Sequence, residues 1–124
     1  MLPRSRVVAT VDDDRRVRES VQSVLESAGY DAVVFESGEA FLDSGALSEV
    51  ACVVADVRLP GIDGLELQRR VRRERPSVPI IFITAHDDDD VRRRALRDGA
   101  AAFMLKPFDG DELLDRIARM TNES

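Results

Sequence analysis

The feature that most constrains this chain is its regular alternation between short apolar runs and longer segments with helical periodicity. The apolar runs cover residues 7–11, 31–35, 51–55, 80–84 and 101–105. Each is rich in β-branched and other apolar residues, which predicts a short strand that is apolar on both faces. Strands of this kind are typical of a parallel sheet that helices cover on both sides.

Helical periodicity fills the segments between these runs. The first predicted helix follows the capping residue Asp14 and ends at Gly29. A shorter helix follows position 37, a third begins near 64 and stops before Pro76, a fourth covers 90–98, and the last begins after Asp109. The apolar side chains expected to face the core are Val17, Val21, Val24, Leu25 and Ala28, then Ala40 and Phe41, Leu67 and Val71, Val91 and Leu96, and finally Leu113, Leu114, Ile117 and Met120.

Five strand–helix units in succession predict a single doubly wound α/β domain over residues 1–124. A domain of this size buries roughly two thirds of the surface of its unfolded chain, so we expect no metal or disulfide staple. No apolar run approaches the roughly 20 residues that span a bilayer, and we expect a cytoplasmic protein with no signal peptide and no membrane partner. Cys52 lies in an apolar run, where a packing role is favoured over a catalytic thiol.

Polar or charged side chains end or directly follow four of the predicted strands. Asp12 and Asp13 come after the first, Asp56 after the third, Thr84 ends the fourth and Lys106 follows the fifth. Ligands of open parallel sheets bind at the carboxyl ends of the strands, so these groups should converge. Helix capping explains one acidic residue, but a carboxylate after a fully apolar run is costly unless it is paired or coordinated. Mutual repulsion of the carboxylates favours Mg²⁺ and phosphate oxygens over a purely structural cluster.

Four segments carry a resemblance to a known family. They resemble segments of the receiver domain of bacterial two-component response regulators. The segments are 11–14 (Val-Asp-Asp-Asp), 56–64 (Asp-Val-Arg-Leu-Pro-Gly-Ile-Asp-Gly), 84–85 (Thr-Ala) and 106–108 (Lys-Pro-Phe). Residues 41–42, 64–67 and 99–100 are similar to receivers of FixJ/NarL-type regulators. The resemblance covers nearly the whole chain. It implies a flavodoxin-like or CheY-like (βα)5 domain with a five-stranded parallel sheet of order 2-1-3-4-5.

The resemblance implies a phosphoacceptor and a metal site. Asp56 would take a phosphoryl group from a sensor histidine kinase, or from a small phosphodonor, as an acyl phosphate. Asp13, Asp56 and the backbone carbonyl of Arg58 would bind Mg²⁺ directly, and Asp12 would act mainly through a bound water. Phosphoryl transfer requires an in-line nucleophile and cations beside the equatorial oxygens, which agrees with these roles.

The resemblance also implies the groups that respond to the phosphoryl group. The hydroxyl of Thr84 and the ammonium of Lys106 would contact its oxygens. Phe103 would be the aromatic residue that moves when Thr84 shifts, and the alternative is a phenylalanine that only fills the core. Ala85 is small, which would leave the phosphoryl group open to water. Among 18 basic residues Lys106 is the only lysine, a compact charge that reaches into a narrow pocket, and a cis bond to the proline that follows is expected. His86 is interpreted as a loop residue.

The predicted helix over 90–98 carries a group of arginines after the acidic run 87–90. Solvation explains such a face, but in this family the helix, the fifth strand and the last helix form the surface that changes partner on phosphorylation. We therefore expect a phosphorylation-dependent homodimer through this surface. DNA would be reached only through an output domain, which we do not expect in this chain. The net charge of −6 also disfavours general nucleic-acid binding. The arginines are Arg92, Arg93, Arg94 and Arg97.

The alternative from another class is an aspartyl-phosphate phosphohydrolase on a related α/β sheet. Enzymes of that class carry the pattern Asp-x-Asp at the nucleophile, whereas residues 56–58 of this chain are Asp-Val-Arg. The missing second carboxylate and the lack of a cap domain favour a signalling switch with only self-catalysed phosphorylation and autodephosphorylation. A degenerate receiver is disfavoured, because all five pocket residues are present.

Overall fold

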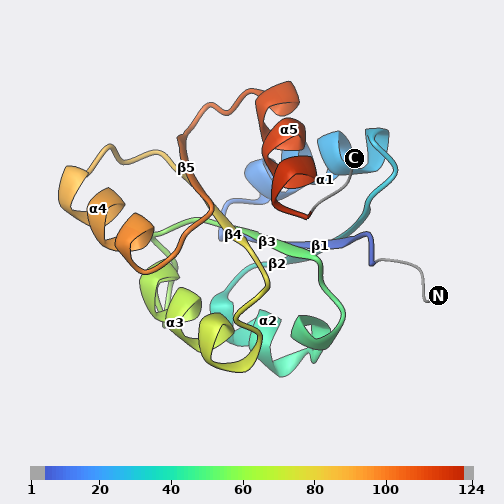
Figure 1. The fold of residues 1–124 in the computed structure, drawn as a ribbon. Helices are drawn as coiled ribbons and strands as arrows, with labels where there is room; N and C mark the ends of the chain where they lie inside the picture. Colours follow the sequence, from blue (N-terminus) through green and yellow to red (C-terminus); the bar gives the residue numbers. More distant parts are fainter. Residues whose placement is uncertain (1–4, 122–124) are drawn as a thin grey trace.

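The computed structural model describes residues 5–121 and has three layers, with a parallel sheet between two layers of helices (Figure 1). The strand order is β2-β1-β3-β4-β5, which confirms the predicted doubly wound α/β fold. The ends of the predicted 1–124 domain lie outside the described residues. The elements are β1 (Val7–Val11), α1 (Arg15–Ser27), β2 (Asp31–Phe35), α2 (Gly38–Asp43), the 3₁₀ helix η1 (Ala46–Ser48), β3 (Cys52–Ala55), α3 (Gly64–Glu74), β4 (Ile80–Thr84), α4 (Asp89–Arg97), β5 (Ala102–Leu105) and α5 (Gly110–Met120).

Each α-helix begins after a residue whose side-chain oxygen accepts a backbone N–H of the first turn. Asp14 caps α1 and Asp109 caps α5, as predicted, and Ser37, Asp63 and Asp88 cap α2, α3 and α4. Such caps satisfy donors that have no partner within the helix. Four of the five caps are carboxylates, which also interact favourably with the positive end of the helix dipole.

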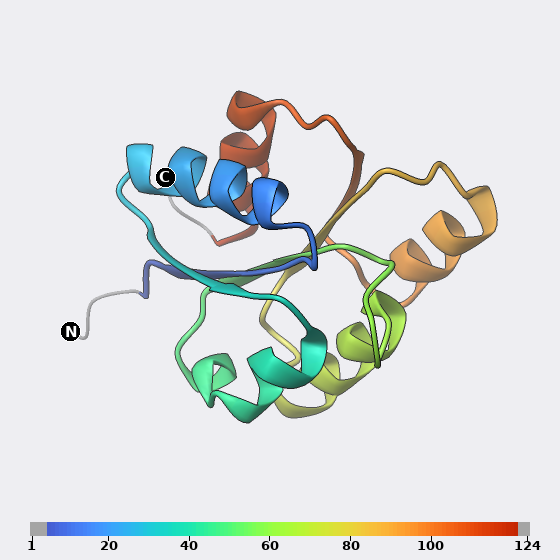
Figure 2. The same cartoon turned by 180° about the vertical axis from the view of Figure 1, so that it is seen from behind.

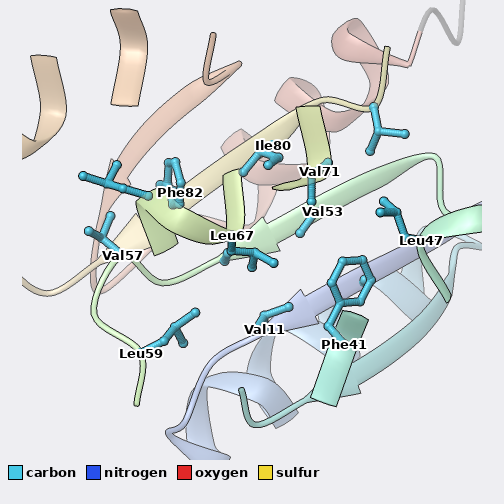
Figure 3. Packing of buried hydrophobic residues seen from close by; sticks show 14 of the residues in the cluster. Val11, Phe41, Leu47, Val53, Val57, Leu59, Leu67, Val71, Ile80 and Phe82 are labelled. Carbon is cyan, nitrogen blue, oxygen red and sulfur yellow. The ribbon is translucent and has the colours of Figure 1, made fainter. Parts of the chain in front are cut away.

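The helices enclose two apolar clusters, one on each face of the sheet. Helices α1 and α5 cover one face, and α2, α3 and α4 lie on the other (Figures 1 and 2). Phe41, Leu67 and Phe82 belong to the cluster beneath α2 and α3, which Figure 3 shows from close by. Leu25 and Leu113 belong to the cluster beneath α1 and α5. Successive residues of β1, β3 and β4 contribute side chains to one cluster and the other in turn, which explains why these central strands are apolar throughout.

Three residues predicted to face the core do not. Ala28 is exposed because it is the C-cap of α1 and lies beyond its last turn. Leu96 is 46% exposed, because Ala95 is the buried residue of α4 and its neighbour points away. Met120 is 37% exposed at the last position of α5. The prediction relied on helical spacing alone, and the spacing does not say how much of each helix the sheet covers.

Element boundaries differ from the prediction by one residue at several ends. Strands β3 and β5 begin one residue later than expected, and α4 runs over 89–97 instead of 90–98. The edge strand β2 is largely solvent-accessible, with Val34 37% exposed, so it is not buried on both faces. The 3₁₀ helix η1 was not expected. Within residues 5–121, no helix is long and apolar enough to cross a membrane.

A glycine brings α3 against the strand that carries the candidate nucleophile. A Cβ atom at Gly64 would lie 2.6 Å from the carbonyl oxygen of Asp56 and 2.7 Å from Cα of Val57. The amide of Gly64 donates to the carbonyl of Val57 over 2.7 Å. The backbone that positions Asp56 therefore depends on the close approach of the first residue of α3.

Replacing Gly64 with alanine should lower the free energy of unfolding by about 1–3 kcal/mol, because the new methyl group meets backbone that cannot move aside cheaply. Urea denaturation measures this difference. Gly110 is the matched control, because it is also the first residue of a helix after an aspartate cap and its added Cβ would meet only side-chain atoms of Val24, at 3.2 Å or more. Gly110→Ala should change stability by less than about 1 kcal/mol; equal losses in both variants would contradict the explanation.

Candidate functional site

The carboxyl ends of β1, β3, β4 and β5 meet at one edge of the sheet. Asp12 follows β1 and is 2% exposed, and Asp56 follows β3 and is 6% exposed. Thr84 ends β4 and is also buried, and Lys106 follows β5. Asp13 lies beside Asp12 with an exposed side chain. The structure therefore brings together the side chains of Asp12, Asp13, Asp56 and Lys106, and Thr84 ends β4 at the same edge of the sheet, because parallel strands end together.

A single ammonium group bridges the two buried carboxylates. Nζ of Lys106 lies 2.7 Å from Oδ2 of Asp56 and 2.9 Å from Oδ2 of Asp12. The Lys106 side chain is 16% exposed. A buried carboxylate without a partner costs several kcal/mol, so this bridge explains how two of them remain at the edge of an apolar sheet.

Backbone groups hold both carboxylates in place. Oδ1 of Asp56 accepts the amide of Arg58 at 3.0 Å, and Oδ1 of Asp12 accepts the amide of Asp14 at 2.9 Å. These are side-chain contacts to a backbone donor two residues further on, the pattern of an Asx turn. Each carboxylate therefore has one oxygen bound to the backbone and the other bound to Lys106.

Burial and pairing shift the pKa values of this group in a consistent way. Burial raises the pKa of the Asp12 carboxyl above its ordinary value, against the lowering effect of its hydrogen bonds to Asp14 and Lys106. Burial lowers the pKa of the Lys106 ammonium, but its hydrogen bonds and attraction to Asp56 and Asp12 outweigh burial and the pKa is raised. Lys106 is therefore fully charged at neutral pH.

Three carboxylates in this pocket have the arrangement of a cation site. Each of Asp12, Asp13 and Asp56 offers an oxygen atom, and the three atoms lie within 4.8 Å of one another. Hard oxygen ligands of this type suit Mg²⁺, which binds through one or two carboxylates and retains waters. The three carboxylates face only one ammonium, that of Lys106, and a bound cation would offset the negative charge that remains. The donor set therefore fits the predicted metal.

The segment after β4 lies at the same edge. The hydroxyl oxygen of Thr84 accepts the amide of His86 at 3.3 Å, and the side chains of Ala85 and His86 are exposed. The peptide bond between Lys106 and Pro107 is cis, as expected. Phe103 of β5 is half-buried, and its ring centroid lies 6.3 Å from that of Phe82. This aromatic ring therefore belongs to the packing beneath α3 and α4 and does not enter the acidic pocket.

Cys52 takes no part in this site. Its side chain is fully buried, and burial raises the pKa of the thiol to about 12. A thiol with so high a pKa is a poor nucleophile at neutral pH, which confirms the packing interpretation over the catalytic one.

Comparison with known proteins decides the family. Residues 8–118 match the model of the response regulator receiver domain. The chain belongs to this family. It is 39% identical over 110 residues to the transcriptional regulatory protein FixJ of Bradyrhizobium diazoefficiens, covering 89% of this chain and 54% of that protein. It is 42% identical over 116 residues to FixJ of Azorhizobium caulinodans, covering 94% of this chain and 55% of that protein.

The receiver domain thus spans about half the length of these curated relatives. A solved receiver domain protein (CheY-like) from Methanospirillum hungatei matches it with a TM-score of 0.87 and 25% identity, covering 96% of this chain and 95% of that one. Receiver domains are signalling modules of two-component systems, which interact with histidine kinases, and they are not classical enzymes. The family assignment therefore favours the signalling interpretation over a phosphohydrolase.

Sequence reasoning missed several contacts that shape the site. The link from Lys106 to Asp12 was not expected, and neither was the contact from the Arg18 guanidinium to the carbonyl oxygen of Asp12 at 2.8 Å. In α2, Glu39 accepts the amide of Ile62 at 3.0 Å and so ties down the loop after Asp56. No motif marks these partners, because each pair joins residues that are distant along the chain or on separate elements.

Replacing Lys106 with methionine should lower the free energy of unfolding by about 3 kcal/mol in EDTA, because two buried carboxylates lose their shared cation. Urea denaturation measures this loss. Since the pKa of Lys106 is raised in the fold, its contribution should be fully present up to its ordinary value of 10.5 and disappear only as pH rises further.

Arg119→Met is the control for this prediction, because Arg119 forms an exposed ion pair with Asp115 on α5 at 3.1 Å. Its loss should cost less than about 1 kcal/mol. Adding Asp12→Asn to Lys106→Met should recover part of the stability. A loss at Lys106 no larger than at Arg119 would show that the bridge contributes little.

Proposed function

We propose that this receiver domain is a phosphorylation-activated switch in which Asp56 accepts a phosphoryl group from a sensor histidine kinase. The observation that carries the proposal is the bridge from Lys106 to Asp56 and Asp12 at the carboxyl edge of the sheet. The role of nucleophile is supported by the position of this carboxylate after a buried strand and by its contacts with one ammonium and one amide. The only reactions of the domain itself would be phosphorylation of Asp56 and its autodephosphorylation.

The transfer requires one bond to form and one to break. An oxygen of Asp56 attacks the phosphorus atom of the donor phosphohistidine, and the phosphorus–nitrogen bond breaks with its electron pair leaving on the imidazole. The amide of Arg58 orients the carboxylate through its 3.0 Å hydrogen bond. Lys106 offsets the charge of the equatorial oxygens, since its ammonium already lies 2.7 Å from the nucleophile.

Asp13, Asp56 and the backbone carbonyl of Arg58 would hold Mg²⁺ directly, and Asp12 would hold it through water. When bound, the ion supplies the positive charge that lets a phosphoryl group approach three carboxylates. Oxygen atoms of Asp12, Asp13 and Asp56 within 4.8 Å of one another support this assignment. Ala85 would leave the phosphoryl group accessible to attacking water, because its small side chain lies exposed beside Thr84.

Thr84 and Phe103 would carry the signal from the pocket to the surface. A phosphoryl group attracts hydroxyl donors, so Thr84 would exchange its contact with the His86 amide for one with a phosphoryl oxygen. Thr84 pairs in the sheet with Leu105, two residues after Phe103. A shift at the end of β4 would thus reach β5, where the Phe103 ring is only half-buried.

The α4–β5–α5 face would be the output of the switch. Leu96 on α4 and Leu105 on β5 are 46% and 44% exposed, which is a large apolar exposure for a highly charged surface. Opposite charges along α4, where Arg92 and Arg93 lie near Asp89 and Asp90, allow self-complementary pairing across a two-fold axis. We propose that phosphorylation promotes a homodimer through this face and so controls a partner or an output domain. Transcription is the inferred output, because the relatives are transcriptional regulators.

Acetyl phosphate with Mg²⁺ should add one phosphoryl group to the domain, and Asp56→Asn should abolish the addition, because the variant lacks the nucleophilic oxygen. Intact mass spectrometry measures the product, and EDTA should prevent its formation. Asp63→Asn is the control, because Asp63 caps α3 near the same edge and asparagine retains the cap. Phosphorylation of the Asp56 variant, or its loss in the Asp63 variant, would contradict the assignment.

Beryllofluoride with Mg²⁺ should convert the domain from monomer to dimer in light scattering coupled to size exclusion. Leu105→Asp should leave the domain folded and monomeric in both conditions, because a charge at this exposed position opposes burial of the face. Val34→Asp is the control, since Val34 is 37% exposed on the opposite edge strand β2. A wild-type domain that stays monomeric with beryllofluoride would refute the dimer.

A further inference from the structure

A second concentration of charge lies outside the acidic pocket, between α3 and the C-terminal end of α4. These helices lie side by side in both views (Figures 1 and 2). The groove between them has a volume of about 440 Å³ and is lined by Arg69, Arg72, Arg73, Arg97 and Asp98. None of these residues belongs to the proposed phosphorylation site.

The groove is positively charged in a chain whose net charge is −6. Arg69 and Arg70 share one carboxylate, that of Glu66, at 3.0 and 3.1 Å, and Arg97 lies 3.7 Å from Asp98. Arg73 has no ion pair among residues 5–121. The lining of the groove therefore holds four guanidinium groups against one carboxylate, and α3 also carries Glu66 and Glu74.

Neutralisation of the helix ends does not account for this excess. Arginines in a last turn stabilise the negative end of a helix dipole, and both α3 and α4 end near this groove. Each helix C-terminus contributes roughly half a negative charge, so the two ends amount to about one. The lining of the groove therefore keeps an excess of positive charge after the helix ends are counted, which favours the binding of an anion.

The walls of the groove are tied to each other. Nε2 of Gln68 donates to the carbonyl of Ala95 at 2.9 Å, and the guanidinium of Arg72 donates to the carbonyl of Asp98. Both donors are on α3 and both acceptors are at the end of α4. Gly99 makes room for Arg72, since a Cβ at Gly99 would collide with its guanidinium. The site thus has a preformed frame, with Arg73 and Arg97 on its two sides.

We propose that this groove binds a compact anion with two or more phosphate groups, such as inorganic pyrophosphate or a nucleoside diphosphate. Guanidinium forks bind phosphate oxygens in pairs, and the open groove leaves the donors of Arg73 and Arg97 accessible to a small anion. A long polyanion such as duplex DNA is disfavoured, because α4 bears Asp88, Asp89 and Asp90 at its other end. That acidic turn lies about 14 Å along the helix from Arg97 and would repel a rod that follows α4.

Calorimetric titration with pyrophosphate and separately with ADP, in EDTA, tests the proposal. Wild type should bind at least one of them at a single site, and Arg73→Gln and Arg97→Gln should each weaken affinity about tenfold through loss of charge-assisted hydrogen bonds. Arg119→Gln is the matched control, because the side chains of Arg119 and Arg97 are both 72% exposed and each lies near one carboxylate. It should leave affinity unchanged.

Several results would overturn the proposal. One is the absence of saturable binding of either anion, and another is a loss of affinity in the Arg119 variant as large as in the Arg73 and Arg97 variants. A third is displacement of pyrophosphate by a DNA duplex at a lower concentration, which would assign the groove to nucleic acid. Asp56→Asn should bind normally, because the groove lies outside the phosphorylation site; weakened binding in that variant would locate the anion in the acidic pocket instead. Phosphorylation of the Arg73 and Arg97 variants by acetyl phosphate shows that they are folded.

Discussion

The bridge that Lys106 forms with Asp56 and Asp12 is the interaction on which the site depends. Two carboxylates at the end of a buried sheet repel each other and pay a large desolvation cost. One ammonium at 2.7 and 2.9 Å compensates much of that cost, and the backbone amides of Arg58 and Asp14 hold the remaining oxygens. The pocket is stable because it is paired, yet it remains negative enough to attract a cation.

The same geometry explains why a switch can be built at this edge. The proposed nucleophile, Asp56, directly follows the central strand β3, whereas Thr84 and Lys106 lie at the ends of β4 and β5, next to segments that reach the surface. Helix α3 has two roles in this arrangement. Gly64, its first residue, fixes the backbone at Asp56, and Gln68 and Arg72 secure the end of α4. The helix that supports the proposed phosphorylation site is thus also the helix that contacts the end of α4, part of the proposed output face.

The fold and the pocket were predictable because local patterns carry them. Apolar runs and aspartate caps mark the elements, and a parallel sheet must place the ends of its strands together, so Asp12, Asp56, Thr84 and Lys106 converge without knowledge of any contact. The prediction of buried residues failed where burial depends on whether a neighbouring helix or strand covers the side chain. Leu96 and Met120 have helical spacing suited to a core but lie where no element covers them.

The sequence by itself determined the order of strands and helices, the caps, and the identity of the groups that meet at the carboxyl edge. Only the tertiary structure decided which of those groups pair, because the distances from Lys106 to Asp12 and Asp56 depend on how β1, β3 and β5 are placed across the sheet. It also decided that the arginines of α3 and α4 line one groove, because these residues are distant along the chain and come together only when the two helices pack side by side.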